Sequence, residues 1–243
     1  MQADKRKALV TGGSGDIGGA ICAALARDGW QVIVHANGNR ERAEAVATAI
    51  HESGGDAEVV TFDVTDGAAA RTALEALLAS GPIHGLVHNA GIHDDAPLAG
   101  MTEAQWRRVI DVSLHGFFHV AQPLLLPMAR ARFGRIVAVS SVAATLGNRG
   151  QVNYAAAKSA LHGAVKSLAR EMASRNLTSN VVAPGIIEGR LTQELFTQEQ
   201  LKAMIPAGRA GTPAEVAGMV AFLCSDAASY VNGQVIGVNG GMG

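Results

Sequence analysis

The stretch Thr11-Gly12-Gly13-Ser14-Gly15-Asp16-Ile17-Gly18 follows a short apolar run and leads into a segment whose apolar residues recur at helical spacing. Three of its glycines, Gly13, Gly15 and Gly18, satisfy the spacing G-x-G-x-x-G. A turn of this kind between a strand and a helix directs backbone N–H groups and the positive helix end at a pyrophosphate. The turn therefore predicts a dinucleotide-binding site formed by Gly12, Ser14, Gly15, Asp16, Ile17 and Gly18.

The rest of the chain alternates short apolar or β-branched runs with longer Ala- and Leu-rich stretches of helical spacing. This alternation predicts parallel βαβ units in a doubly wound α/β sheet of the Rossmann type, with seven strands and helices on both faces. The predicted strands are 8–11, 31–35, 58–62, 85–88, 135–140, 179–183 and 234–238, and the first predicted helices are 17–27, 40–52 and 68–79.

The domain organisation follows from the absence of a low-complexity linker or internal repeat in the sequence. We therefore expect one dinucleotide-binding and catalytic domain over 1–243. The stretch 184–211 interrupts the regular alternation with several prolines and glycines, and it is too long for an ordinary connection. Since ligands bind beyond the carboxyl ends of parallel strands, we expect a substrate lid at about 186–211. The alternative is an irregular surface loop.

Composition and charge exclude several classes of function. With 20 Lys and Arg against 21 Asp and Glu, the formal net charge is −1, and no basic run is long enough to predict nucleic-acid binding. No apolar stretch reaches the roughly 18 to 20 residues that cross a bilayer, so we expect no membrane span and a cytoplasmic protein. Cys22 and Cys224 lie far apart, which predicts neither a disulfide framework nor a metal site.

The end of the second predicted strand bears on the choice of cofactor. An acidic residue there would bind a ribose 2′-hydroxyl and select NAD, but the sequence from Val32 to Arg40 contains none. Asn37, Asn39 and Arg40 could donate hydrogen bonds to a 2′-phosphate, which favours NADPH. In the alternative interpretation, Arg40 is a solvated residue in the first turn of the next helix.

A second set of residues carries the predicted chemistry. Tyr154 and Lys158 share one helical face because they are separated by four positions. A neighbouring ammonium is expected to lower the pKa of the phenol from about 10, so that it can exchange a proton at cellular pH. Ser141, expected at the end of the fifth strand, could hold a carbonyl oxygen beside the phenol.

Together with Asp63-Val64, Asn89-Ala90-Gly91 and Pro184-Gly185, these motifs resemble those of the short-chain dehydrogenase/reductases in their expected order. Within that family, the segments 147–158, 180–185 and 238–242 are most similar to the 3-oxoacyl-(acyl-carrier-protein) reductases. The resemblance implies NADPH-dependent reduction of a 3-oxoacyl thioester to the 3-hydroxyacyl thioester. It also implies a homotetramer that packs through helices around 106–129 and 152–174.

The resemblance also implies a role for each matching residue. Tyr154 would protonate the ketone oxygen, Ser141 would position it, and Lys158 would hold the nicotinamide ribose and lower the pKa of Tyr154. The cofactor would contact Asp63 and Val64 at the adenine, Asn89, Ala90 and Gly91 along its floor, and Pro184, Gly185 and Ile187 at the nicotinamide.

A basic cluster is the predicted docking surface for the acyl carrier protein. Arg130, Arg132 and Arg135 precede or begin the fifth strand. Arg132 and Arg175 match positions that face the acidic carrier beside the active-site mouth in the reductases that the chain resembles. The alternative is a set of solvated arginines that complement helix dipoles.

Three departures from the family pattern stand out. Asp16 occupies the usual place of a glycine, where its charge should weaken pyrophosphate binding. Ser113 replaces the asparagine that usually completes the catalytic set, so the proton relay is expected to need an extra water. The loop 92–95 contains Asp94 and Asp95, which suggests a specialised fatty-acid or polyene pathway.

Two other functions remain open at this point. One is an NAD(P)-dependent dehydrogenase of a small alcohol, sugar or polyol, and the other is a cofactor-binding subunit with little catalysis of its own.

Overall fold

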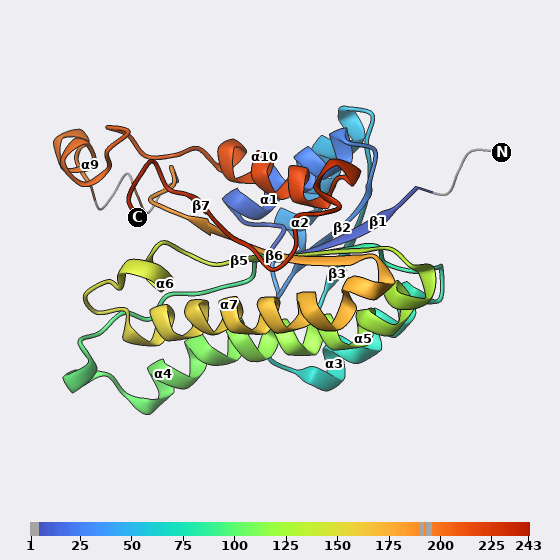
Figure 1. Ribbon diagram of the computed structural model, residues 1–243, viewed down its shortest axis with the longest axis horizontal. Coiled ribbons are helices and arrows are strands. Elements are labelled where there is room, and N and C mark those ends of the chain that lie inside the picture. The colour runs from blue at the N-terminus through green and yellow to red at the C-terminus, as the bar shows by residue number, and fades with distance from the viewer. Residues whose placement is uncertain (1–4, 190–191, 193–195) are drawn as a thin grey trace.

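The computed structural model describes residues 5–189, 192 and 196–243. Its strands form one parallel sheet in the order β3-β2-β1-β4-β5-β6-β7, which confirms the predicted doubly wound α/β fold (Figure 1). The strands are β1 (Lys7–Thr11), β2 (Gln31–Ala36), β3 (Asp56–Thr61), β4 (Gly85–His88), β5 (Gly134–Val139), β6 (Leu177–Pro184) and β7 (Val235–Val238).

Helices cover both faces of the sheet (Figure 1). One layer contains α1 (Asp16–Arg27), α2 (Arg40–Glu52) and α10 (Pro213–Cys224), and the other contains α3 (Gly67–Leu78), α4 (Glu103–Ile110), α5 (Gly116–Ala131) and α7 (Val152–Met172). The remaining elements are η1 (Leu98–Gly100), the π-helical η2 (Asp111–His115), α6 (Ala143–Leu146), η3 (Ala173–Arg175), α9 (Gln198–Met204) and η4 (Asp226–Ala228).

Local sequence explains where several helices begin. The side chains of Asn39 and Asp66 accept hydrogen bonds from the first-turn backbone of α2 and α3. Thr102 and Thr212 form capping boxes with the third residues of α4 and α10. These side chains satisfy backbone N–H groups that would otherwise lack a partner inside the helix.

The core consists of two apolar layers, one on each face of the sheet. Ala8 and Val10 of β1 face the layer that contains Ile21 of α1, whereas Leu9 faces the layer that contains Leu74 of α3. Alternate residues of one strand thus enter opposite layers, and both are buried. This burial on both faces explains why the central strands are almost continuously apolar in sequence.

Arg135 does not belong to a surface cluster, contrary to the prediction. It is the second residue of β5 and only 1% exposed. Its guanidinium donates to the carbonyl oxygens of Gly134, Asn176 and Ser225, at 3.0–3.3 Å. These bonds satisfy the buried charge inside the fold, so Arg135 is unavailable to a carrier protein.

Within one chain, Arg132 and Arg175 do not lie beside the active site. Arg132 ends α5 just before β5, and Arg175 lies just before β6. The Asn176 side chain donates to the Arg132 carbonyl oxygen at 3.1 Å, which places the two arginines on a common edge. That edge carries the amino ends of the parallel strands, whereas Ser141 follows the carboxyl end of β5.

The predicted lid is described only in part. Ile187 pairs with Gly211, and α9 begins at a Thr197 capping box between them. Residues 190–191 and 193–195 lie outside the described residues.

Candidate active site

The glycine turn between β1 and α1 is shaped to receive a phosphate group. Gly12 has a φ of +64°, and a side chain at Gly18 would collide with the carbonyl oxygen of Gly12. Gly15 is the N-cap of α1 and provides no side-chain cap, so the N–H groups of the first turn remain open to an anion. These features fit the pyrophosphate of a dinucleotide.

Two side chains that the sequence did not single out support this turn. Nδ1 of His35, at the end of β2, accepts a hydrogen bond from the Gly12 backbone N–H at 3.2 Å, and its Nε2 bonds the Phe62 carbonyl oxygen at 2.9 Å. Oγ1 of Thr11 accepts from the backbone N–H groups of Asn89 and Ala90, both at 3.1 Å. Asn89, a predicted cofactor residue, also donates to the Gly12 carbonyl oxygen at 3.1 Å.

The charge of Asp16 at this turn has a nearby partner. Its carboxylate lies 3.7 Å from Nη2 of Arg42 on α2, and both side chains are 60% exposed. An exposed pair of this kind reduces the local negative charge near the turn without removing it. The sequence predicted a cost to pyrophosphate binding but did not identify Arg42 as its counterpart.

The predicted adenosine end opens onto a cavity of about 460 Å³. Two of the predicted cofactor-binding residues, Asn37 and Asp63, line it. Asp63 Oδ1 is held by the backbone N–H and the hydroxyl of Thr65, each at 2.8 Å. The sequence did not predict the rest of the lining. Most of these residues belong to the loop after β4 or to the continuous helix Glu103–Ala131, which begins with α4: Ile92, Ala104, Arg107, Arg108, Asp111 and Val112.

Two of the residues predicted for the 2′-phosphate have other partners. Asn39 Oδ1 accepts from the Arg42 backbone N–H at 3.0 Å and so caps α2. Arg40 Nε donates to Glu44 Oε1 at 2.7 Å within the same helix. This geometry matches the alternative interpretation of Arg40 as a solvated residue, whereas Asn37 remains exposed on the cavity.

Ser141, Tyr154 and Lys158 lie together near the carboxyl end of β5. Ser141 stands two residues beyond the last residue of that strand, rather than at its end. Its hydroxyl accepts from the Ala143 backbone N–H at 3.2 Å and hydrogen-bonds to the Tyr154 side chain. Lys158 is almost fully buried, and its Nζ donates to the Val139 carbonyl oxygen at 2.8 Å.

The predicted lowering of the pKa of Tyr154 by Lys158 is wrong for the protein in this state. Burial raises the pKa of Tyr154 and Asp95 raises it further, whereas the Ser141 hydrogen bond lowers it. The Lys158 ammonium lies 5.7 Å from the centre of the phenol ring. Burial lowers the pKa of Lys158 itself to about 8. At neutral pH the phenol therefore carries its proton.

Ser113 occupies the π-helical segment η2 and is fully buried. Its hydroxyl has no hydrogen-bond partner among the described residues. A side chain built on Gly91 would approach Lys158 Nζ to 3.0 Å and Ser113 Oγ to 3.7 Å. Because Gly91 has no side chain, space remains between Lys158 Nζ and Ser113 Oγ. Both groups can form further hydrogen bonds.

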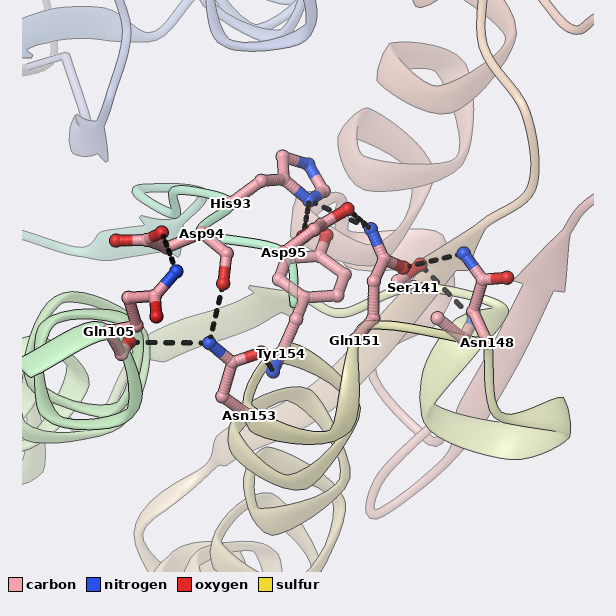
Figure 2. A network of polar contacts seen from close by, with 10 residues as sticks. His93, Asp94, Asp95, Gln105, Ser141, Asn148, Gln151, Asn153 and Tyr154 are labelled. Atoms are coloured by element: carbon pink, nitrogen blue, oxygen red, sulfur yellow. Dashed lines mark hydrogen bonds and ion pairs between the residues drawn. The ribbon is translucent and has the colours of Figure 1, made fainter. Parts of the chain in front are cut away.

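The loop after β4 reaches the site through a polar network (Figure 2). The His93 ring stacks on the Tyr154 ring, and Asp95 accepts from Gln151 Nε2 at 2.8 Å. Asp94 bonds Gln105 and, through its backbone carbonyl oxygen, the Asn153 side chain. The acidity of this loop was visible in the sequence, but its bonding partners, which come from α4 and from the beginning of α7, were not.

The residues predicted at the nicotinamide lie at the carboxyl end of β6. The Pro184 carbonyl oxygen accepts from the Val142 backbone N–H at 2.7 Å, next to Ser141. The Gly185 backbone N–H donates to the Val238 carbonyl oxygen at 3.0 Å. Ile187 follows them and pairs with Gly211. The fold thus gathers the predicted Ser141, Tyr154, Lys158 and β6 residues at one edge.

A family model described as Enoyl-(Acyl carrier protein) reductase matches residues 13–243. The chain belongs to the short-chain dehydrogenase/reductase family. This family uses a nicotinamide dinucleotide as its redox cofactor. The open glycine turn, with its unshared first-turn N–H groups, fits that group in this chain.

Curated relatives within this family cover nearly the whole chain. A 3-oxoacyl-(acyl-carrier-protein) reductase from Aggregatibacter actinomycetemcomitans is 45% identical, over 96% of this chain and 98% of the relative. The enzyme of that name from Escherichia coli K12 is 42% identical, over 100% of this chain and 99% of the relative. A solved structure of a putative gluconate dehydrogenase from Agrobacterium tumefaciens superposes with a TM-score of 0.94 at 33% identity, and covers 98% of this chain and 95% of its own.

Proposed function

We propose that the protein reduces the ketone of a 3-oxoacyl thioester, carried by acyl carrier protein, to the 3-hydroxyacyl thioester. The observation that carries this proposal is the 42–45% identity to reductases of that activity over almost the full chain. The clustering of Ser141, Tyr154 and Lys158 supports it, since ketone reduction needs a proton donor beside the carbonyl oxygen.

In this proposal, Ser141 and Tyr154 both hydrogen-bond to the ketone oxygen, and the phenol donates its proton as that oxygen becomes an alcohol. A bound nicotinamide dinucleotide supplies the hydride. The raised pKa of Tyr154 supports its role as the acid, because the proton is present at neutral pH. Ser113 and Lys158 hold a water molecule that returns a proton to Tyr154 after each turnover.

We propose NADPH as the preferred form of the cofactor. The support is the absence of an acidic residue between Val32 and Arg40, together with the exposed Asn37 at the adenosine cavity. Arg40 contributes less than the sequence suggested, because it is paired with Glu44. The rest of the cofactor-binding surface consists of the other predicted residues: Asp63, Val64, Asn89, Ala90, Gly91, Pro184, Gly185 and Ile187.

The decisive experiment is an assay of the purified protein with a 3-oxoacyl thioester, once with NADPH and once with NADH. We expect oxidation of the cofactor with formation of the 3-hydroxyacyl product, and a higher kcat/KM with NADPH. A protein that leaves the thioester unchanged with both cofactors would refute the proposal.

The structural likeness to a putative gluconate dehydrogenase favours one second candidate, oxidation of a sugar acid or polyol. The lower identity of that structure, 33%, makes it the weaker candidate. Gluconate with NAD⁺ and with NADP⁺ in the same assay separates the two. A weakly catalytic cofactor-binding subunit would turn over neither substrate, although the intact Ser141, Tyr154 and Lys158 argue against it.

We propose that the protein works as a homotetramer. Phe118 and Leu126 on α5 are 62% and 63% exposed, and a second copy would cover them. The continuous helix Glu103–Ala131 is long and apolar enough to cross a membrane by length and composition alone, yet it packs on α3 and α7. Burial of its exposed face in an oligomer agrees with a cytoplasmic protein.

In such a tetramer, the predicted docking surface of one copy would serve the active site of another copy. Arg132 and Arg175 lie at the strand edge opposite Tyr154, so a carrier bound there delivers its acyl group to the active site of another copy. We further propose that the partly described segment 186–211 closes over the bound substrate. The acidic loop 92–95 supports a specialised fatty-acid or polyene substrate.

A further inference from the structure

A chain of side chains runs from the residues that precede α7 to the loop after β4 and ends above the ring of Tyr154 (Figure 2). Asn148 Nδ2 donates to Gln151 Oε1 at 2.9 Å. Gln151 Nε2 contacts Asp95 Oδ2 at 2.8 Å and His93 Nδ1 at 3.3 Å. The His93 and Tyr154 rings stack with centroids 4.3 Å apart and planes inclined by 29°.

This chain determines which nitrogen of His93 carries the proton. The Asp95 carboxylate can only accept, so the Gln151 amide turns its NH₂ group toward it. Asn148 donates to the amide oxygen and fixes the same orientation. One amide proton goes to Asp95 and the other to His93 Nδ1, which must therefore accept. In the neutral ring the proton then resides on Nε2.

The charged and titratable groups around the ring agree with a neutral imidazole. On its own loop, Asp95 Oδ1 lies 3.9 Å from His93 Nδ1 and favours protonation. From α7, Lys158 disfavours it, and Tyr154 presents an uncharged ring. Burial is the largest influence, and the pKa of His93 lies below its ordinary value. At neutral pH the ring is therefore an Nε2–H donor.

That donor is unused and accessible. Figure 2 shows Nδ1 turned toward Gln151 and Asp95, with Nε2 on the far side of the ring. No hydrogen bond joins Nε2 to any described residue, and 52% of the side chain is exposed. The network thus holds a solvent-accessible hydrogen-bond donor on the ring that stacks against Tyr154.

We propose that His93 Nε2–H binds the thioester carbonyl oxygen of a 3-oxoacyl substrate while Ser141 and Tyr154 bind its ketone oxygen. One methylene carbon separates these two carbonyls, and the His93 and Tyr154 rings, stacked with centroids 4.3 Å apart, bring two kinds of donor to the same part of the site. His93 is then a specificity-determining residue that selects a 1,3-dicarbonyl substrate over a simple ketone. The inference rests on the proposed function.

The test compares wild type, His93→Phe and His93→Gln on a soluble 3-oxobutanoyl thioester and on 2-pentanone, which lacks the second carbonyl. Phe keeps the stack on Tyr154 without a donor, whereas Gln keeps an N–H donor. We expect His93→Phe to lower kcat/KM about tenfold more for the thioester than for 2-pentanone, as loss of one hydrogen bond implies. His93→Gln should recover most of that loss.

Equal losses on both substrates, or no loss on the thioester, would overturn the role of His93. Nitrogen NMR of the histidine ring gives a readout that does not depend on activity: we expect the Nε2–H tautomer at pH 7, and the Nδ1–H tautomer contradicts the inference. If the wild type does not reduce the thioester at all, the proposed function fails instead.

Discussion

His88 Nε2 donates to the backbone carbonyl oxygen of Ser113 at 3.0 Å and so joins β4 to the π-helical segment η2. The other ring nitrogen lies 3.2 Å from Thr11 Oγ1, which already accepts from two backbone N–H groups. The hydroxyl proton of Thr11 therefore goes to His88 Nδ1, which leaves the ring proton on Nε2. One neutral histidine thus ties β1, β4 and η2 together beneath the proposed site.

We expect His88→Leu to destabilise the protein by about 1–3 kcal/mol, because it leaves the Ser113 carbonyl and the Thr11 hydroxyl buried without their partner. Urea unfolding followed by circular dichroism measures the change. His88→Gln retains a donor and should cost less. Equal stability of His88→Leu and wild type would show that the bond contributes nothing.

Tyr154→Phe should lower kcat by about 10² to 10⁴ while cofactor binding persists, because it removes the proton donor and keeps the ring. Steady-state kinetics and a fluorescence titration with NADPH measure the two effects. Tyr230→Phe is the matched control, since Tyr230 is fully exposed and is the only other tyrosine. A Tyr154→Phe enzyme with wild-type turnover would remove Tyr154 from the mechanism.

Asn37→Asp should reverse or abolish the preference for NADPH, since a carboxylate at the adenosine cavity repels a 2′-phosphate and accepts from a 2′-hydroxyl. Asn37 is exposed, whereas the neighbouring Ala36 is buried, so the charge is better placed at Asn37 than at Ala36. The ratio of kcat/KM for NADPH and NADH is the measurement. An unchanged ratio would show that this position does not contact the ribose.

Acid should destabilise the glycine turn through His35. Burial lowers the pKa of His35 from its ordinary 6.5 to about 4. Between pH 6.5 and about pH 4, this histidine is therefore protonated in the unfolded chain but not in the folded protein. Stability from this group is complete above pH 6.5 and falls as pH drops toward 4, by up to about 1.4 kcal/mol per pH unit. Urea unfolding from pH 7 to pH 5 measures the slope, and His35→Gln should reduce it, while the buried His88, whose pKa is also lowered, keeps part of it. An identical slope in that variant would contradict this origin.

Charge reversal by Arg132→Glu together with Arg175→Glu should raise KM for a carrier-bound substrate, more at low salt than at high salt. A small soluble thioester should keep its KM, because the two residues lie at the edge opposite Tyr154. Arg27→Glu with Arg71→Glu is a control of equal charge change at exposed positions on other helices. If both substrates, or neither, respond in the Arg132 and Arg175 variant, carrier docking at this edge is refuted.

The sheet, the glycine turn and the grouping of Tyr154 with Lys158 could be predicted from patterns along the chain. Each depends on local order along the chain: strand and helix periodicities, glycine spacing, and the four-residue interval that defines one face of a helix. The helix 40–52 was predicted to the residue, and most strand ends fell within one or two positions.

The environments of those residues could not be predicted in this way, because they are set by contacts between distant parts of the chain. The pKa of Tyr154 depends on burial and on Asp95, and the tautomer of His93 depends on Gln151 and Asn148. The position of Ser113 in η2 leaves its hydroxyl buried without a hydrogen-bond partner among the described residues. These partners come from segments tens of residues apart. Solvation and hydrogen bonding act through space, so the direction of a pKa shift cannot be derived from spacing along the chain.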